Sequence, residues 1–305
     1  MKPIAPHINP RTFTAKLLLA LSLLSLGLYL VSIDSFVTLV VGTILIGAMF
    51  AHAVELQHQC LHNTGFKSRA ANRLVGILLG LPTLSSFHRY RRAHLEHHRS
   101  LGTPNDVTFF TYRFLENPTF GSFLYDFFGI AHLKVALASV LLQGKSGLIT
   151  EGSSADEDYT AERVDYALMA FMLACFYLYS ITTGSDFLLK AWLLPMIFVA
   201  QPIHFLVELP EHIGCAPRST DPFRNTRTIA GSWFSYWFTN GNNFHVEHHL
   251  APALSMDQMR DLFLQNKGRH HHYHHSYFDF FTSIFRLARA HRAALEVDQT
   301  ARRPA

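Results

Sequence analysis

Four apolar stretches constrain the fold of this chain more than any other feature of its sequence. They cover residues 17–33, 36–56, 166–183 and 187–206. A transmembrane helix needs about 20 predominantly apolar residues, and in lipid only helices and closed barrels satisfy every backbone hydrogen bond. The composition agrees, because 49% of the residues are hydrophobic and only 16% are charged. The sequence therefore predicts an all-α integral membrane protein with four transmembrane helices.

Very short breaks separate the stretches within each pair. Asp34 and Ser35 divide the first pair, and Gly184, Ser185 and Asp186 divide the second. Two helices joined by so short a break must run in opposite directions through the bilayer. We therefore expect two transmembrane hairpins.

The positions of Lys and Arg predict the orientation of these hairpins. Three of the 26 precede the first span, 11 lie between the hairpins, 11 follow the second hairpin, and the last is Lys190 in the fourth span. Because cytoplasmic segments carry the excess of positive charge, both termini are expected in the cytoplasm. Residues 1–305 then form a single membrane-embedded domain, with a cytoplasmic helical cap made of residues 57–165 and 207–305.

Three histidine clusters lie on this cytoplasmic side. They are His58 and His62, then His94, His97 and His98, and finally His245, His248 and His249. Residues three or four apart share one face of a helix, so each cluster presents its imidazoles in one direction. Zinc sites use only three or four ligands, so eight imidazoles favour two metal ions. Neutral nitrogen ligands suit iron, copper, zinc and nickel.

Two further groups contain histidine. Glu208 and His212 lie four residues apart, directly after the fourth span, and His212 is a candidate ninth ligand. The alternative for His212 is an ordinary histidine in an interfacial loop. The run at residues 270–275 contains five histidines, and we interpret it as a solvated surface segment that binds metal only adventitiously.

The three clusters resemble the histidine boxes of the membrane fatty acid desaturase/hydroxylase superfamily, which are non-haem di-iron enzymes. The boxes here read HQCLH at 58–62, HLEHH at 94–98 and HVEHH at 245–249, and the likeness runs from about residue 47 to 262. The resemblance implies two Fe ions as cofactors, with no catalytic side chain beyond the metal ligands. It implies nine histidine ligands: His58, His62, His94, His97, His98, His212, His245, His248 and His249. Glu208 is then a possible additional ligand, directly or through water.

The resemblance also implies the reaction. O2 is a co-substrate, and an acyl chain of a fatty acyl lipid or acyl thioester loses two hydrogens to form a double bond. A hydroxylase or ketolase acting on a carotenoid, alkane or specialised metabolite is the alternative within the superfamily. A membrane metal transporter is a remote alternative, because its ligands should lie near the bilayer midplane. No nucleic acid partner is expected.

The electrons for this reaction are expected from a separate carrier. The chain has no dinucleotide fingerprint, no cysteine cluster and no fused cytochrome b5 domain. A ferredoxin, rubredoxin or cytochrome b5 would supply two electrons per turnover. We expect this acidic carrier to dock on positive charge from Arg89, Arg91, Arg92, Arg224 and Arg227.

Overall fold

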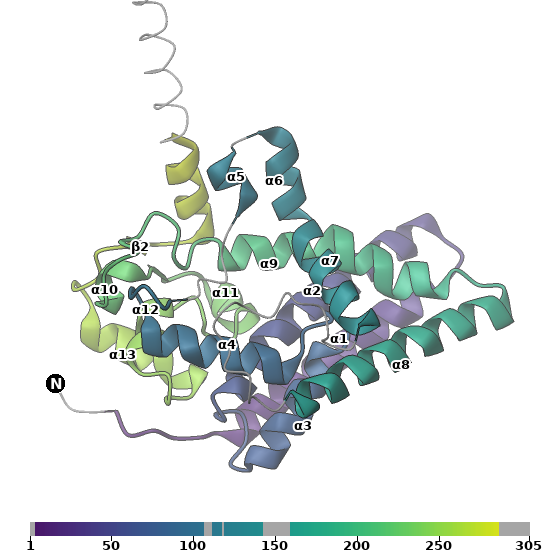
Figure 1. Ribbon diagram of the computed structural model, residues 1–305, viewed down its shortest axis with the longest axis horizontal. Helices are drawn as coiled ribbons and strands as arrows, with labels where there is room; N and C mark the ends of the chain where they lie inside the picture. Colours follow the sequence, from purple (N-terminus) through teal and green to yellow (C-terminus); the bar gives the residue numbers. More distant parts are fainter. Residues whose placement is uncertain (1–3, 107–111, 118, 143–158, 287–305) are drawn as a thin grey trace, which may run out of the picture.

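The structure, a computed structural model, describes residues 4–106, 112–117, 119–142 and 159–286. Within these residues the chain is mostly helical (Figure 1). The sheet that they contain has two parallel strands of two residues each, β1 (Thr228–Ile229) and β2 (Tyr273–His274). The prediction of an all-α architecture is therefore confirmed in its main feature.

Four helical segments of the described chain are long and apolar enough to cross a membrane. They are α1 (Pro10–Val31), α2 (Phe36–Leu61), α8 (Thr160–Thr183) and Leu189–Glu208. The last segment consists of the π-helices η1 (Leu189–Leu193) and η2 (Met196–Ala200) followed by α9 (Gln201–Glu208). Pro195, which lacks the amide hydrogen of a regular helix, lies between the two π-helical turns. These segments confirm the four predicted candidate spans and identify a membrane protein.

Two glycines bring α1 and α2 close together. A Cβ atom at Gly27 would lie 2.8 Å from Cγ1 of Ile46, and a Cβ atom at Gly42 would lie 2.8 Å from the carbonyl oxygen of Gly27. Small residues at such contacts let the backbones of apolar helices approach each other. The resulting helix pair holds the last turn of α2 in place, and this turn carries His58.

The spans differ in how much of their surface the rest of the protein covers. Only 17% of the apolar window is buried in α1 and in α8, compared with 50% in α2 and 44% in Leu189–Glu208. Phe171 of α8, for example, is 69% exposed. The apolar outer faces of α1 and α8 are suited to contact lipid.

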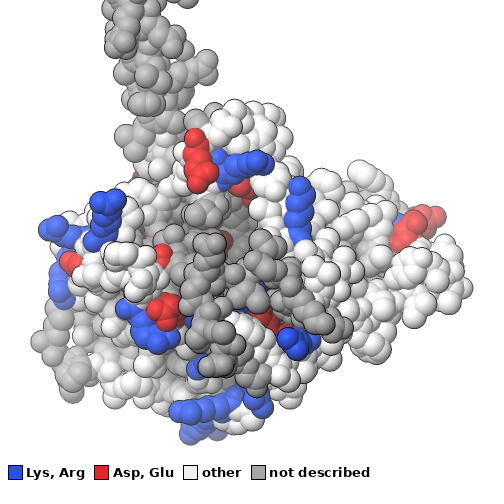
Figure 2. Space-filling model, in the orientation of Figure 1, with Lys and Arg blue, Asp and Glu red and all other residues white. Residues whose placement is uncertain are grey.

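The remaining helices gather mainly around the ends of α2 and α9. They are α3 (Arg69–Gly80), α4 (Phe87–Ser100), α5 (Arg113–Glu116), α6 (Phe120–Phe127), α7 (Ile130–Leu141), α10 (Pro222–Asn225), α11 (Trp233–Phe238), α12 (His245–Leu250), η3 (Met256–Gln258) and α13 (Met259–Asn266). In Figure 1, α4, α10, α12 and α13 lie together at the left, and α8 extends to the right. The charged side chains are unevenly distributed on the face shown in Figure 2. The part of the molecule that extends to the right has almost no charged side chains except at its far end.

The helices α6 and α7 form a pair bent by 46° that could also be one broken span. The bend lies at Gly129, whose φ of 58° is in the left-handed region. A Cβ atom there would lie 2.0 Å from Oε1 of Gln201 in α9, so glycine lets the start of α7 approach this side chain closely. This close contact places α7 beside the cavity described below.

Candidate metal centre

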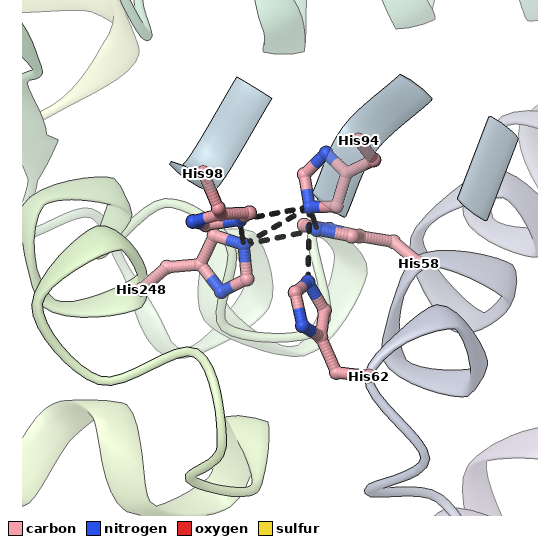
Figure 3. A group of neighbouring side chains, drawn as sticks. All are labelled: His58, His62, His94, His98 and His248. Atoms are coloured by element: carbon pink, nitrogen blue, oxygen red, sulfur yellow. Dashed lines mark hydrogen bonds between the residues drawn. The ribbon is translucent and has the colours of Figure 1, made fainter. Parts of the chain in front are cut away.

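Five imidazoles from three helices converge on one point, and we call them the five-histidine group. Figure 3 shows them: His58 and His62 at the end of α2, His94 and His98 from α4, and His248 from α12. Their Nε2 atoms lie 2.7 Å apart for His58 and His94, 2.9 Å for His62 and His94, 3.0 Å for His94 and His98, and 2.9 Å for His98 and His248. One ligand atom from each residue lies within 4.8 Å of all the others.

These short nitrogen–nitrogen distances fit a metal ion better than a hydrogen-bond network. The Nε2 atom of His94 lies within 3.4 Å of four other Nε2 atoms. A neutral imidazole has one N–H group, so most of these contacts would pair one lone pair with another. A transition metal ion between the nitrogens would replace that repulsion with coordination, and imidazole suits such ions.

A second set of four imidazoles, the four-histidine group, lies beside the first. Ligand atoms of His97, His212 and His249 lie within 4.8 Å of one another. The Nε2 atom of His245 is 3.1 Å from Nε2 of His212 and 3.1 Å from Nε2 of His249. All nine predicted histidines are therefore in one of the two groups.

The helices α4 and α12 each contribute to both groups. On α4, His94 and His98 are four residues apart and share one face, whereas His97 lies on a neighbouring face and joins the four-histidine group. On α12, His245 and His249 join the four-histidine group, and His248 joins the five-histidine group. Two short helices thus bridge the two candidate metal positions.

A tight turn sets the direction of α12. Asn240 has a φ of 51° and Gly241 a φ of 85°, both in the left-handed region. A Cβ atom at Gly241 would lie 2.7 Å from the carbonyl oxygen of Met256, so a side chain does not fit there. This turn directs α12 so that its histidines meet those of α2 and α4.

Polar side chains on the far side of the imidazoles orient the four-histidine group. The Nδ1 atom of His97 is 2.8 Å from Oδ1 of Asp106. His212 Nδ1 is 3.1 Å from the carbonyl oxygen of Asn225, and His245 Nδ1 is 3.1 Å from Oδ1 of Asn242. An Nδ1–H group that donates to these oxygens leaves Nε2 as the atom available to a metal. Our sequence analysis did not identify these partners.

A buried hydrogen-bond network holds α12 from behind. Glu247, between His245 and His248, is completely buried. Its Oε2 accepts a hydrogen bond of 2.7 Å from Oγ1 of Thr228, and its Oε1 lies 2.6 Å from Nε2 of His270. The side chain of His270 is only 3% exposed. Our interpretation of residues 270–275 as a solvated surface segment is therefore wrong for His270, which supports the third histidine cluster.

Burial keeps the histidines in the neutral form that binds metal. It lowers the pKa of His94, His245, His248 and His249 well below the usual imidazole value, and neighbouring histidines lower it further. The pKa of His212 falls to about 4 for the same two reasons. The Nε2 lone pairs are therefore not blocked by protons at neutral pH.

The carboxylate of Glu211 lies on the Nε2 side of the four-histidine group. Its Oε2 is 3.4 Å from Nε2 of His245, and its Oε1 accepts a 2.7 Å hydrogen bond from Asn242. Burial, together with the nearby carboxylates of Glu208 and Glu55, raises the pKa of Glu211 well above its usual range. A bound cation would oppose this shift and favour the charged carboxylate.

Glu208, the acid that the sequence suggested as an additional ligand, has a different position. Its carboxylate is 3.3 Å from Nε2 of His204, one turn earlier in α9. It lines the same cavity as Glu211 but is not among the residues grouped around either metal position in the described chain.

A cavity of about 430 Å³ opens beside both histidine groups. His58, His94, His97 and His245 form part of its wall. Apolar side chains from α2, α7 and α9 form another part, among them Val54, Val135 and Phe205. Its volume falls within the range of about 300 to 1,000 Å³ that is typical of small-molecule sites. The cavity can thus bring a largely apolar molecule next to the histidine nitrogens.

The five arginines expected to dock an electron carrier do not form one surface. Arg227 is buried, donates a hydrogen bond to the carbonyl oxygen of Pro210 and stacks on Phe280. Arg89 lines the cavity. Only Arg224 is fully exposed, while Arg91 and Arg92 are half-buried and bonded to Leu61 and Glu162, respectively. Arg224 is thus the most exposed of the five, and docking of a carrier stays a prediction.

The fold and site define a membrane protein with two adjoining histidine groups that could each hold a metal ion. The sequence model of the family described as Fatty acid desaturase matches residues 35–281, and the chain belongs to this family. The two histidine groups agree with the histidine boxes of the superfamily. Membership identifies the chain as an oxidoreductase of a family that uses iron. No curated protein sequence matches the chain significantly.

Proposed function

We propose that this protein is an O2-dependent di-iron oxidoreductase that introduces a double bond into an acyl chain. One iron is held by the five-histidine group and the other by the four-histidine group. The observation that supports this most directly is the pair of adjoining Nε2 clusters, both facing one cavity lined in part by apolar side chains. Glu211 is a further candidate ligand in the four-histidine group. Contact of Glu208 with a metal through water stays a prediction.

The protein contributes orientation and exclusion of water. Bound iron supplies the activation of O2 and the oxidation of an unactivated C–H bond. Asp106, Asn225 and Asn242 hold the imidazoles of the four-histidine group with Nε2 directed inwards. The apolar part of the wall, with Val54 and Phe205, keeps the reacting carbons next to the nitrogens and away from bulk water.

The arrangement in the membrane is part of this proposal. The four spans form two hairpins of one domain, both termini lie in the cytoplasm, and the cap carries the histidines on the same side. Support comes from the short turns at residues 32–35 and 184–188 and from the distribution of Lys and Arg. A separate cytoplasmic carrier (a ferredoxin, rubredoxin or cytochrome b5) supplies the electrons.

Iron analysis and product analysis together test the function. We expect two irons per chain in the purified protein. Expression in a host that supplies reduced carrier should yield a lipid product that has lost two hydrogens. A product that has instead gained one oxygen atom would favour the hydroxylase or ketolase alternative. A protein with bound iron but no O2-dependent product from any acyl substrate would contradict the proposal.

A further inference from the structure

The cavity has one permanent positive charge among its described lining residues, the guanidinium of Arg89. Arg89 lies in the first turn of α4, and its Nη1 atom is 3.5 Å from Oγ of Ser139 and 3.4 Å from the hydroxyl oxygen of Tyr166. Both of these residues also line the cavity. These hydrogen bonds are at the long end of the normal range, so the guanidinium retains most of its capacity to donate.

Two carboxylates of α8, Asp165 and Glu162, form their contacts with groups other than Arg89, although Oδ1 of Asp165 has no hydrogen-bond partner among the described residues. Asp165 Oδ2 accepts hydrogen bonds from the Ser86 hydroxyl, from the backbone amide of His88 and from its ring. Glu162 forms an ion pair of 2.5 Å with Arg92. Among the described residues, no carboxylate forms an ion pair with Arg89. A buried or half-buried guanidinium without such a partner favours an anion from outside the chain.

Two acidic side chains of the cavity lie beside histidines. Glu211 contacts His245, and Glu208 contacts His204. His132 also lines the cavity and interacts electrostatically with His204 and with Arg89. The remaining acids of the wall are Glu55, three residues before His58 on α2, and Asp126, which accepts a hydrogen bond from the amide of Phe114. The wall of the cavity therefore has a metal end, at the histidine groups, and an Arg89 end, with a cation and two hydroxyls.

One helix sets the separation of these two ends. Arg89 and His94 are five residues apart on α4, and Arg89 and His97 are eight apart. At 1.5 Å per residue, these separations are about 7.5 Å and about 12 Å along the helix axis. A molecule whose charged end binds Arg89 would therefore place a carbon several bonds away beside the histidines.

We propose that Arg89 binds the free carboxylate of the substrate, so that the enzyme accepts a small carboxylic acid rather than an acyl thioester or a lipid ester. The reaction of the bound acid rests on the proposed function, whereas the binding of its carboxylate by Arg89 does not. A planar guanidinium matches a carboxylate with two parallel hydrogen bonds, whereas an ester or thioester carbonyl offers no negative charge. The cavity of about 430 Å³ accommodates a ligand of small-molecule size.

Anaerobic binding to the iron-loaded, full-length protein tests this directly, because it needs no turnover. Isothermal titration calorimetry in lipid nanodiscs would compare hexanoate, 1-hexanol and hexyl phosphate. We expect hexanoate to bind about tenfold to a hundredfold more tightly than 1-hexanol, the range that hydrogen bonds to a charged partner provide. In the Arg89→Gln variant this preference should disappear, while the affinity for 1-hexanol stays the same.

The matched control is Arg99→Gln, on the same helix. The Arg99 side chain is 74% exposed and pairs with Glu96 outside the cavity, so this variant should bind hexanoate like the wild type. Arg89→Lys keeps the charge without the planar fork and should retain part of the preference. Equal iron content in all variants would show that the site is intact.

Two results would overturn the proposal. One is equal binding of hexanoate and 1-hexanol by the wild-type protein. This result can be obtained even if the Arg89→Gln variant does not fold. The other is tighter binding of hexyl phosphate than of hexanoate, which would assign a phosphate head group instead of a carboxylate. An inactive protein that still prefers hexanoate would contradict the proposed function and leave this inference intact.

Discussion

The two histidine groups contain the same type of ligand atom but are held in different ways. In the four-histidine group, His97, His212 and His245 each have a polar partner at Nδ1. Nδ1 of His249, the fourth member, is buried and has no hydrogen-bond partner among the described residues, and the same holds for His98 and His248 of the five-histidine group. Hydrogen bonds therefore orient three imidazoles of the four-histidine group, whereas packing orients His249 and at least His98 and His248 of the five-histidine group. The two should respond differently to substitution.

The largest effect is expected from removing one imidazole from either group. His248→Ala takes a nitrogen from the five-histidine group, and His97→Ala takes one from the four-histidine group. Each variant should lose activity entirely and lose about half of its iron, because a metal site has few ligands to spare. Activity assays and iron analysis of the purified proteins measure this.

His271→Ala is the control for these two variants, since His271 is exposed and lies outside both groups. It should keep wild-type iron and activity. Normal iron content in His97→Ala would break the assignment of the four-histidine group. Removal of His62 should resemble removal of His248, because both belong to the five-histidine group.

A smaller effect, confined to one group, is expected from Asp106→Asn. The substitution keeps the shape of the side chain but removes the charge that accepts the hydrogen bond from His97. Outer partners of this kind typically change metal affinity by about 10-fold to 100-fold. Metal titration followed by absorption or Mössbauer spectroscopy should show one weakened site and one unchanged site. Equal weakening of both sites would show that the two groups do not depend on different supports.

The histidines were predictable from the sequence, but their partition was not. Spacings of three and four residues place imidazoles on one face of a helix, and this identified all three clusters. Spacing does not show that His97 turns away from His94 and His98 to another metal position, because that depends on how α4 packs against α2 and α12. The prediction of an additional acidic ligand shows the same limit. Glu208 and Glu211 are both close to His212 in sequence, and spacing alone does not show which carboxylate lies beside the four-histidine group.

The residues that hold the histidines in place were less predictable from the sequence than the histidines themselves. Asp106 lies in a connecting segment and Asn225 is the last residue of the short helix α10, and no local pattern marks either as a partner of an imidazole. His270 lies in a run of histidines whose composition suggested exposure, yet its neighbours pair as β2 with β1. Such long-range contacts are set by tertiary packing. The four spans, by contrast, follow from apolar length alone.

An effect on stability rather than on metal affinity is expected from Glu247→Gln. The carboxylate accepts hydrogen bonds from Thr228 and from His270, and a glutamine amide can replace only one of these acceptors. Leaving a buried donor unsatisfied costs about 1 to 3 kcal/mol. The melting temperature should therefore fall. Glu96→Gln, at the corresponding place in the second cluster but exposed, should change stability by less than about 0.5 kcal/mol.

The smallest effect concerns the entry of electrons, and it would show which group receives them. Arg224 is exposed on α10, and the next residue, Asn225, accepts a hydrogen bond from His212 of the four-histidine group. A carrier that docks on Arg224 would therefore deliver electrons closest to this group. An exposed charge pair contributes about 0.2 to 1 kcal/mol, so Arg224→Glu should slow turnover at limiting carrier by at most about fivefold. The slowing should vanish at high salt, where exposed charges are screened.

Arg73→Glu is the matched control for Arg224, because Arg73 is also exposed but lies on α3, which packs against α2 and α4. If the carrier docks beside the four-histidine group, Arg73→Glu should leave turnover unchanged at every salt concentration, and both variants should keep wild-type iron content. Slower turnover in Arg73→Glu alone would place the carrier beside α3, nearer to the five-histidine group. Since α3 packs on α2, whose end carries His58 and His62, electrons would then reach the five-histidine group first.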